Sequence, residues 1–165
     1  MKIRPIQSQD DAQLYQLIRN ILEEEGLALP GTAYEDETLV ELSTFYKQTK
    51  NAAYFVLVDE KEAHKVYGGV GIAPFSVGVA ELQKFYLTKE ARGQGWSRKL
   101  MDQAIDFAQK HYQKLYLESH TKLKAALKLY QDYGFEPLEH ALLESEHSAM
   151  NVWLLKNLLL DCKKA

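Results

Sequence analysis

The stretch from Leu87 to Ser97 reads Leu-Thr-Lys-Glu-Ala-Arg-Gly-Gln-Gly-Trp-Ser and joins a predicted strand to a predicted helix. Gly93 and Gly95 allow the backbone to turn tightly and to approach a ligand closely. The first amides of the helix have no partners inside it, and the helix macrodipole places partial positive charge there. Because Arg92 adds formal positive charge beside these amides, the stretch predicts a site for a phosphate or pyrophosphate.

Two common phosphate motifs do not fit this stretch. A P-loop requires Gly-x-x-x-x-Gly-Lys-Ser/Thr, whereas the glycines here follow a Gly-x-Gly spacing. A dinucleotide-binding fingerprint requires a third glycine three positions after Gly95, where this chain has Arg98. Taken alone, the stretch is equally compatible with a glycine-rich turn surrounded by solvated charges.

The apolar pattern on both sides predicts one mixed α/β domain over residues 1–165. Ser8 is expected to cap the first helix, with Asp11 completing a capping box. The element order is βα(α)βββαβαββ. Strands are expected over 2–6, 53–58, 66–72, 79–88, 114–118, 135–140 and 148–155, and helices over 8–26, from Asp36, over 95–112 and over 123–130.

Bulk composition excludes several classes of function. The 165 residues carry a net charge of −3, which argues against a dedicated nucleic-acid binder. A single cysteine, Cys162, cannot form an intrachain disulfide, and no Cys/His spacing indicates a metal site. No signal peptide follows Met1–Pro5, and no apolar run reaches the roughly 20 residues of a membrane span. We therefore expect a cytoplasmic protein without membrane or metal partners.

Two segments carry a family resemblance. The run Arg92–Ser97 resembles the Gln/Arg-x-x-Gly-x-Gly/Ala coenzyme A motif of the GNAT N-acetyltransferase superfamily, with serine at the last position. The run Ala126-Leu-Lys-Leu-Tyr-Gln-Asp-Tyr-Gly-Phe135 resembles that superfamily's Ala-x-x-Leu-Tyr-x-x-x-Gly-Phe segment, and Leu123 stands where an asparagine is often found. The strand that begins Glu81-Leu-Gln-Lys-Phe-Tyr and the segment 147–156 resemble one subgroup. The two motifs together, in the expected order, are more specific than either alone.

The resemblance implies a GNAT fold, with a mixed central sheet of six to seven strands and about four helices. It also implies transfer of an acetyl group from acetyl-CoA to a primary amine of a small molecule or peptide, and a possible homodimer. Two parallel strands would splay to leave a slot for the thioester. The main chain of Phe85, Tyr86 and Leu87 would bind the pantetheine arm. The pyrophosphate would be held by Arg92, Gly93, Gln94, Gly95, Trp96 and Ser97.

The chemistry requires a base for the amine, a donor for the oxyanion and an acid for the leaving thiolate. Tyr130 is the candidate acid, although periodicity alone favours a packing tyrosine. Glu81 is the first candidate base and Glu118 the second. A backbone amide near Leu87 is the candidate oxyanion donor. Histidines at 120, 140 and 147 are weaker candidates for proton transfer, with His147 the first of them.

Several other residues have two interpretations. Trp96 and Trp153 are expected to pack, and Tyr34, Phe45 and Tyr46 are candidates for lining an acceptor pocket. The acidic run 23–25 could attract a cationic amine, but a solvated helix end is the favoured interpretation. Two further functions stay open: a non-catalytic CoA-binding module on the same fold, and an interaction domain without a ligand.

Overall fold

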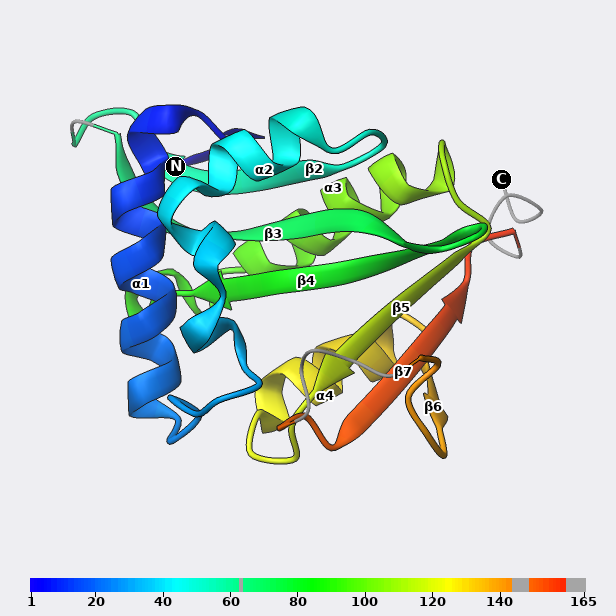
Figure 1. Cartoon of the computed structure of the whole chain (residues 1–165). Coiled ribbons are helices and arrows are strands. Elements are labelled where there is room, and N and C mark those ends of the chain that lie inside the picture. The colour runs from blue at the N-terminus through cyan, green and yellow to red at the C-terminus, as the bar shows by residue number, and fades with distance from the viewer. Residues whose placement is uncertain (63, 144–148, 160–165) are drawn as a thin grey trace.

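The computed structural model describes residues 1–62, 64–143 and 149–159. Its described residues form a seven-stranded sheet in the order β1-β2-β3-β4-β5-β7-β6 (Figure 1). All neighbouring strands are antiparallel except β4 and β5, which are parallel. The strands are β1 (Lys2–Pro5), β2 (Ala53–Asp59), β3 (Lys65–Ser76), β4 (Val79–Leu87), β5 (Lys114–Ser119), β6 (Glu136–Leu138) and β7 (Val152–Asn157).

In the described part of the chain, four α-helices cover the two faces of this sheet (Figure 1). They are α1 (Asp11–Glu24), α2 (Leu42–Gln48), α3 (Trp96–Gln109) and α4 (Lys124–Asp132). Their apolar faces form two cores: α1 and α2 pack on one side, and α3 and α4 pack on the other. The predicted mixed α/β fold with six to seven strands and about four helices is confirmed.

The first helix begins differently from the prediction. The capping box is formed by Gln7 and Asp10, with the Gln7 amide donating to Asp10 Oδ2 at 2.8 Å, and Ser8 starts a short 3₁₀ turn, η1 (Ser8–Asp10). The buried Asp10 carboxylate also receives two hydrogen bonds from Arg4, at 2.7 and 2.9 Å, which hold it in place for this cap. The predicted Ser8 cap is therefore wrong by one residue.

The second helix is divided into two pieces. Asp36 does cap a helical segment, since its Oδ1 accepts from the Thr38 amide at 2.9 Å, but that segment is a 3₁₀ helix, η3 (Glu37–Glu41). The backbone of Glu41 is not helical, and α2 begins only at Leu42. Consequently Asp36 lies in the segment of short 3₁₀ turns over residues 33–41, rather than at the start of a long helix.

The glycines of β3 mark close approaches, as their position in a strand predicts. A Cβ at Gly69 would overlap the Tyr54 ring, and a Cβ at Gly71 would overlap the Tyr46 hydroxyl. These glycines therefore let two tyrosines of the α1/α2 side lie directly on the sheet.

Candidate functional site

The site begins where β4 and β5 stop pairing. Only Val79–Glu81 pairs with residues 114–116, although both strands continue beyond this point. Figure 1 shows the two strands close together at one end and diverging toward the other. The predicted splay of two parallel strands is thus present in the fold.

A cavity of about 480 Å³ lies at this divergence. Its walls come from α1, β4, the loop before α3, the end of β5 and the start of α4. The lining residues are Ile21, Leu22, Glu25, Ala33, Glu81, Leu82, Gln83, Lys84, Phe85, Tyr86, Leu87, Arg92, Gly93, Ser97, Glu118, Ser119, Lys122, Leu123, Lys124, Ala125, Ala126, Leu129, Tyr130 and Met150.

The loop at the start of α3 has the form that phosphate binding requires. Gly93 and Gly95 have φ angles of 73° and 81°, which glycine adopts without strain. A Cβ on either glycine would meet nothing within 4 Å, so the backbone is open to a ligand. Along α3 in the described chain, the first amide that donates to a backbone carbonyl is that of Lys99, which donates to the Gly95 carbonyl at 3.2 Å. The amides before it point out of the helix start and suit a pyrophosphate.

Arg92 and Gln94 stabilise this loop from within. Arg92 Nε donates to the Leu87 carbonyl at 3.0 Å, and Gln94 Nε2 donates to the Glu90 carbonyl at 2.6 Å. Arg92 also lies 3.9 Å from the carboxylate of Glu25, the residue that follows α1. Both side chains therefore fix the loop conformation, and Arg92 leaves its charge at the cavity wall.

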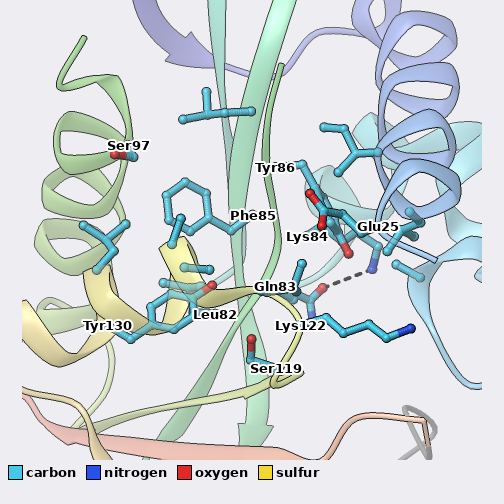
Figure 2. A pocket seen from close by; sticks show the side chains of 18 of the residues that line it. Glu25, Leu82, Gln83, Lys84, Phe85, Tyr86, Ser97, Ser119, Lys122 and Tyr130 are labelled. Atoms are coloured by element: carbon cyan, nitrogen blue, oxygen red, sulfur yellow. Dashed lines mark hydrogen bonds between the residues drawn. The ribbon is translucent and has the colours of Figure 1, made fainter. Parts of the chain in front are cut away.

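Tyr130 reaches the cavity from the α3/α4 side of the sheet. Figure 2 shows it beside Phe85, on the opposite side of β4 from Lys84 and Glu25. The residue is 5% exposed, and burial, followed by the nearby Tyr86 hydroxyl, raises the pKa of its phenol well above 10. Among the described residues, none forms a hydrogen bond with the Tyr130 hydroxyl, which leaves it available to a ligand in the cavity.

Glu81 and Glu118 lie on the opposite face, on the α1/α2 side. Glu81 is opposite Tyr116 in the β4/β5 register, and the Tyr116 hydroxyl donates to Glu118 Oε1 at 2.9 Å. Burial, then the hydrogen bond to Glu118, raises the pKa of Tyr116, so the hydroxyl stays protonated and acts as a donor. The two candidate carboxylates therefore flank one buried tyrosine at the point of divergence.

A β-bulge in β4 shapes the α1/α2 side of the cavity. Gly69 and Gly71 of β3 pair with Tyr86 and Gln83, so β4 has one extra residue in this interval. Lys84 sits in the bulge with a φ of 51°. As a result, Gln83 and Lys84, although adjacent in sequence, both reach groups on the α1/α2 side.

The buried Lys84 side chain forms an ion pair with Asp36. Its Nζ lies 2.7 Å from Asp36 Oδ2, and its side chain is only 4% exposed. Burial alone would raise the pKa of Asp36, but the Lys84 charge and the hydrogen bonds from Lys84 and Thr38 outweigh it and lower the pKa. This ion pair fastens the wall at residues 33–41 to β4.

Most of the residues predicted to act converge on this cavity. All three candidate catalytic residues, Tyr130, Glu81 and Glu118, line it, as do Phe85, Tyr86, Leu87, Arg92, Gly93 and Ser97. Gln94, Gly95 and Trp96 do not; the Trp96 ring packs against the core and carries the Lys99 ammonium 4.2 Å from its centroid.

The remaining candidates lie elsewhere. Tyr34, Phe45 and Tyr46 are not in the lining, and Tyr46 lies behind Gln83. Glu25 does line the cavity, whereas Glu24 pairs with Lys89 at 2.9 Å. His120 accepts from the Lys122 amide at 3.1 Å, His140 is exposed, and His147 and Cys162 lie outside the described residues.

Sequence reasoning missed several lining residues. Gln83, Lys84 and Ser119 reach the cavity through the bulge and the strand divergence, and Asp36 holds Lys84. The available signal was the polar pair Gln83-Lys84 in the middle of a predicted strand, because polar side chains that become buried need hydrogen-bond partners.

One cavity thus brings together a glycine-bounded helix start that suits a pyrophosphate, two splayed parallel strands and a buried tyrosine. A model of the acetyltransferase (GNAT) family matches residues 13–135. An uncharacterized N-acetyltransferase of Escherichia coli K12, YjgM, is 35% identical over 161 residues, which is 94% of each chain. The chain therefore belongs to the GNAT acetyltransferase family.

Solved structures agree on the fold. A GNAT-family acetyltransferase of Staphylococcus aureus Mu50 superposes with a TM-score of 0.81 at 17% identity, covering 95% of this chain and 98% of its own. Spermidine N-acetyltransferase of Vibrio cholerae, solved with CoA and spermine, gives a TM-score of 0.68 at 21% identity, covering 96% and 95%.

The predicted acetyl-CoA cosubstrate is the one that this family uses. No helix in the described part of the chain is long and apolar enough to cross a membrane.

Proposed function

We propose that this protein transfers the acetyl group of acetyl-CoA to a primary amine of a small molecule or peptide by direct attack in a ternary complex. One observation carries the proposal: a single cavity has carboxylates on one face of the sheet and a buried tyrosine on the other. The opening between β4 and β5 connects these two sides. The carboxylates, which would receive the proton of the amine, thus lie on one side of the sheet. The tyrosine, which would face the leaving sulfur, lies on the other.

The cofactor side is formed by β4 and the α3 loop. The unpaired edge of β4 at Phe85–Leu87 suits the amide groups of a pantetheine arm, which can bind as an added strand. Arg92, Gly93 and Ser97 line the cavity at the helix start, where a pyrophosphate is favoured, and Gln94, Gly95 and Trp96 complete the loop. Bound there, acetyl-CoA supplies the activated acetyl thioester.

The amine side is formed by Glu81 and Glu118. An alkyl ammonium titrates near pH 10, so the acceptor must lose a proton before it attacks. Glu81, at the last paired rung of β4, accepts that proton directly or through water, with Glu118 as the second candidate. A backbone amide near Leu87 stabilises the oxyanion.

Tyr130 acts on the leaving sulfur. Because burial raises the pKa of its phenol, the hydroxyl stays protonated at neutral pH. A thiol titrates near 8.5, so complete proton transfer from this tyrosine to a thiolate is uphill. The role consistent with this protonated hydroxyl is hydrogen-bond donation to the sulfur as its negative charge develops.

An amine panel tests the proposal. The protein is mixed with acetyl-CoA and with amino acids, polyamines, lysine peptides and peptides with free N-termini, and thiol release is followed. Polyamines belong in the panel because the Vibrio cholerae neighbour was solved with spermine. We expect thiol release with at least one amine class and an acetylated product of matching mass. CoA binding without thiol release from any amine would instead indicate a non-catalytic CoA-binding module.

A further inference from the structure

Gln83 forms a chain of contacts that leads from α2 to Glu81. The Tyr46 hydroxyl donates to Gln83 Oε1 at 2.7 Å, and Gln83 Nε2 donates to Glu81 Oε2 at 2.9 Å. Lys84 Nζ makes a longer contact, 3.5 Å, with the same Gln83 oxygen, which Figure 2 marks with a dashed line. The Glu81 carboxylate is therefore linked to groups that lie deeper on the α1/α2 side.

Only one orientation of the Gln83 amide satisfies these neighbours. A lysine ammonium is solely a donor, and an ionised carboxylate is solely an acceptor. If the amide were flipped, its NH₂ group would face the Lys84 ammonium and its oxygen would face the Glu81 carboxylate. The charges of Lys84 and Glu81 therefore orient the amide, and the amide in turn donates to Glu81.

Aromatic packing holds the Tyr46 ring, and the absence of a side chain at Gly71 leaves room for the Tyr46 hydroxyl. It is 4% exposed, and its ring lies 4.9 Å from that of Phe45 and 5.2 Å from that of Tyr54. Its hydroxyl occupies space that a Cβ at Gly71 would fill. Burial, followed by the nearby Tyr54, Glu81 and Asp36 groups, raises the pKa of Tyr46, so it remains a donor.

We propose that Gln83 is a positioning residue that holds the Glu81 carboxylate at the β4/β5 opening, with Tyr46 and Lys84 fixing its amide. The catalytic part of this inference rests on the proposed function, in which Glu81 takes the proton of the acceptor amine. Gln83 itself does not take the proton. It favours the ionised, correctly placed form of the carboxylate.

Titratable groups near Glu81 come from α2, β5 and β4. They include the Tyr46 hydroxyl of α2, the Tyr116 hydroxyl of β5, which donates to Glu118, and the Lys84 ammonium behind Gln83, which is paired with Asp36. Loss of the Gln83 amide donor removes a hydrogen bond to the charged form of Glu81, and this raises the pKa of the Glu81 carboxyl.

The test measures titration of the Glu81 carboxyl by NMR in the full chain labelled with ¹³C at the glutamate Cδ. Its signal is assigned by its loss in Glu81→Gln. We expect Gln83→Met to raise the Glu81 pKa by about one unit, the size of one lost hydrogen bond to a charged group. Tyr46→Phe should shift the pKa in the same direction by less, because the Gln83 amide keeps its contact with Lys84.

Tyr54→Phe is the matched control. It removes another buried tyrosine hydroxyl from the same face, one that donates to the Lys84 carbonyl at 2.9 Å rather than to the Gln83 amide. The Glu81 titration should be unchanged in this variant. Unchanged titration in both Gln83→Met and Tyr46→Phe would overturn the positioning role.

Turnover provides the second measurement. With an amine that the wild type acetylates, the acidic limb of kcat/KM should move to higher pH in Gln83→Met by the same amount as the Glu81 titration. A limb that stays in place while the titration moves would overturn the catalytic part of the inference. If the wild type acetylates no amine, the proposed function fails by itself, and the titration still decides whether Gln83 positions Glu81.

Discussion

Packing, rather than polar contacts, holds Tyr130. Its ring centroid lies 5.8 Å from that of Phe135 and 6.5 Å from that of Phe85. Since its hydroxyl forms no hydrogen bond with another described residue, removing that oxygen should leave the packing intact. The hydroxyl can therefore be tested separately from the fold.

We expect Tyr130→Phe to lower kcat about 10²- to 10³-fold, the usual effect of removing one donor to a developing negative charge. CoA affinity measured by calorimetry should be unchanged. Tyr133→Phe is the control, because the Tyr133 hydroxyl donates to Asp102 at 2.6 Å outside the cavity. Equal kcat values for the two variants would remove Tyr130 from the reaction.

Gly93 combines a left-handed backbone with an open environment. We expect Gly93→Ala to lower the unfolding free energy by about 1 kcal/mol through strain at positive φ, and to weaken CoA binding because the new Cβ enters the proposed pyrophosphate site. Gly78→Ala is a matched control: it has the same φ of 73° but lies in the β3–β4 turn. Urea unfolding and calorimetry measure the two effects. Equal CoA affinity in both variants would contradict phosphate binding at this loop.

At the scale of elements, the Lys84–Asp36 pair connects the β4 bulge to η3. We expect Lys84→Met to lower the unfolding free energy by about 3–5 kcal/mol, because it leaves a partly buried carboxylate without its cation. The double variant Lys84→Met with Asp36→Asn should recover part of this loss. Urea unfolding at pH 7 measures both. A double variant as unstable as the single one would show that the bulge geometry, not the charge, sets the cost.

The pH dependence of unfolding checks the same pair independently. The pKa of Asp36 is lower in the folded state than in the unfolded chain, so the pair's contribution is complete above the unfolded value of about 3.9 and is lost as the pH falls through the folded value. Wild type should therefore lose more stability than Asp36→Asn on acidification below about pH 4.

Local signals predicted much of the site, and long-range register determined the rest. The loop from Arg92 to Ser97 depends on glycine and helix-start chemistry within a few residues, so it could be read directly from the sequence. The bulge at Lys84 depends on how β4 aligns with β3, and no pattern within β4 reveals it. For the same reason, the contacts of Gln83 with Tyr46 and of Lys84 with Asp36 were out of reach.

At the scale of the whole molecule, the cavity exists only when α1, β4, β5, α3 and α4 are assembled. Coenzyme A that binds there binds the folded chain alone. At a free concentration 100 times its Kd, it should add about 2.7 kcal/mol to the unfolding free energy. For a chain of this size, that raises Tm by roughly 5–11 °C. Calorimetric melting measures the shift, and no rise in Tm at saturating CoA would contradict binding in this cavity.

The short pairing between β4 and β5 divides the sheet into two half-sheets joined at Val79–Glu81. Under the proposed function, the two substrates approach the sheet from opposite faces. They meet in the gap between β4 and β5 beyond Glu81. Extending the β4/β5 pairing toward Leu87 would close that gap and would also occupy the β4 edge proposed for the pantetheine arm. Such a protein would lose the proposed cofactor edge and the meeting point of the two substrates together, so a pairing of only three residues is what leaves room for the reaction.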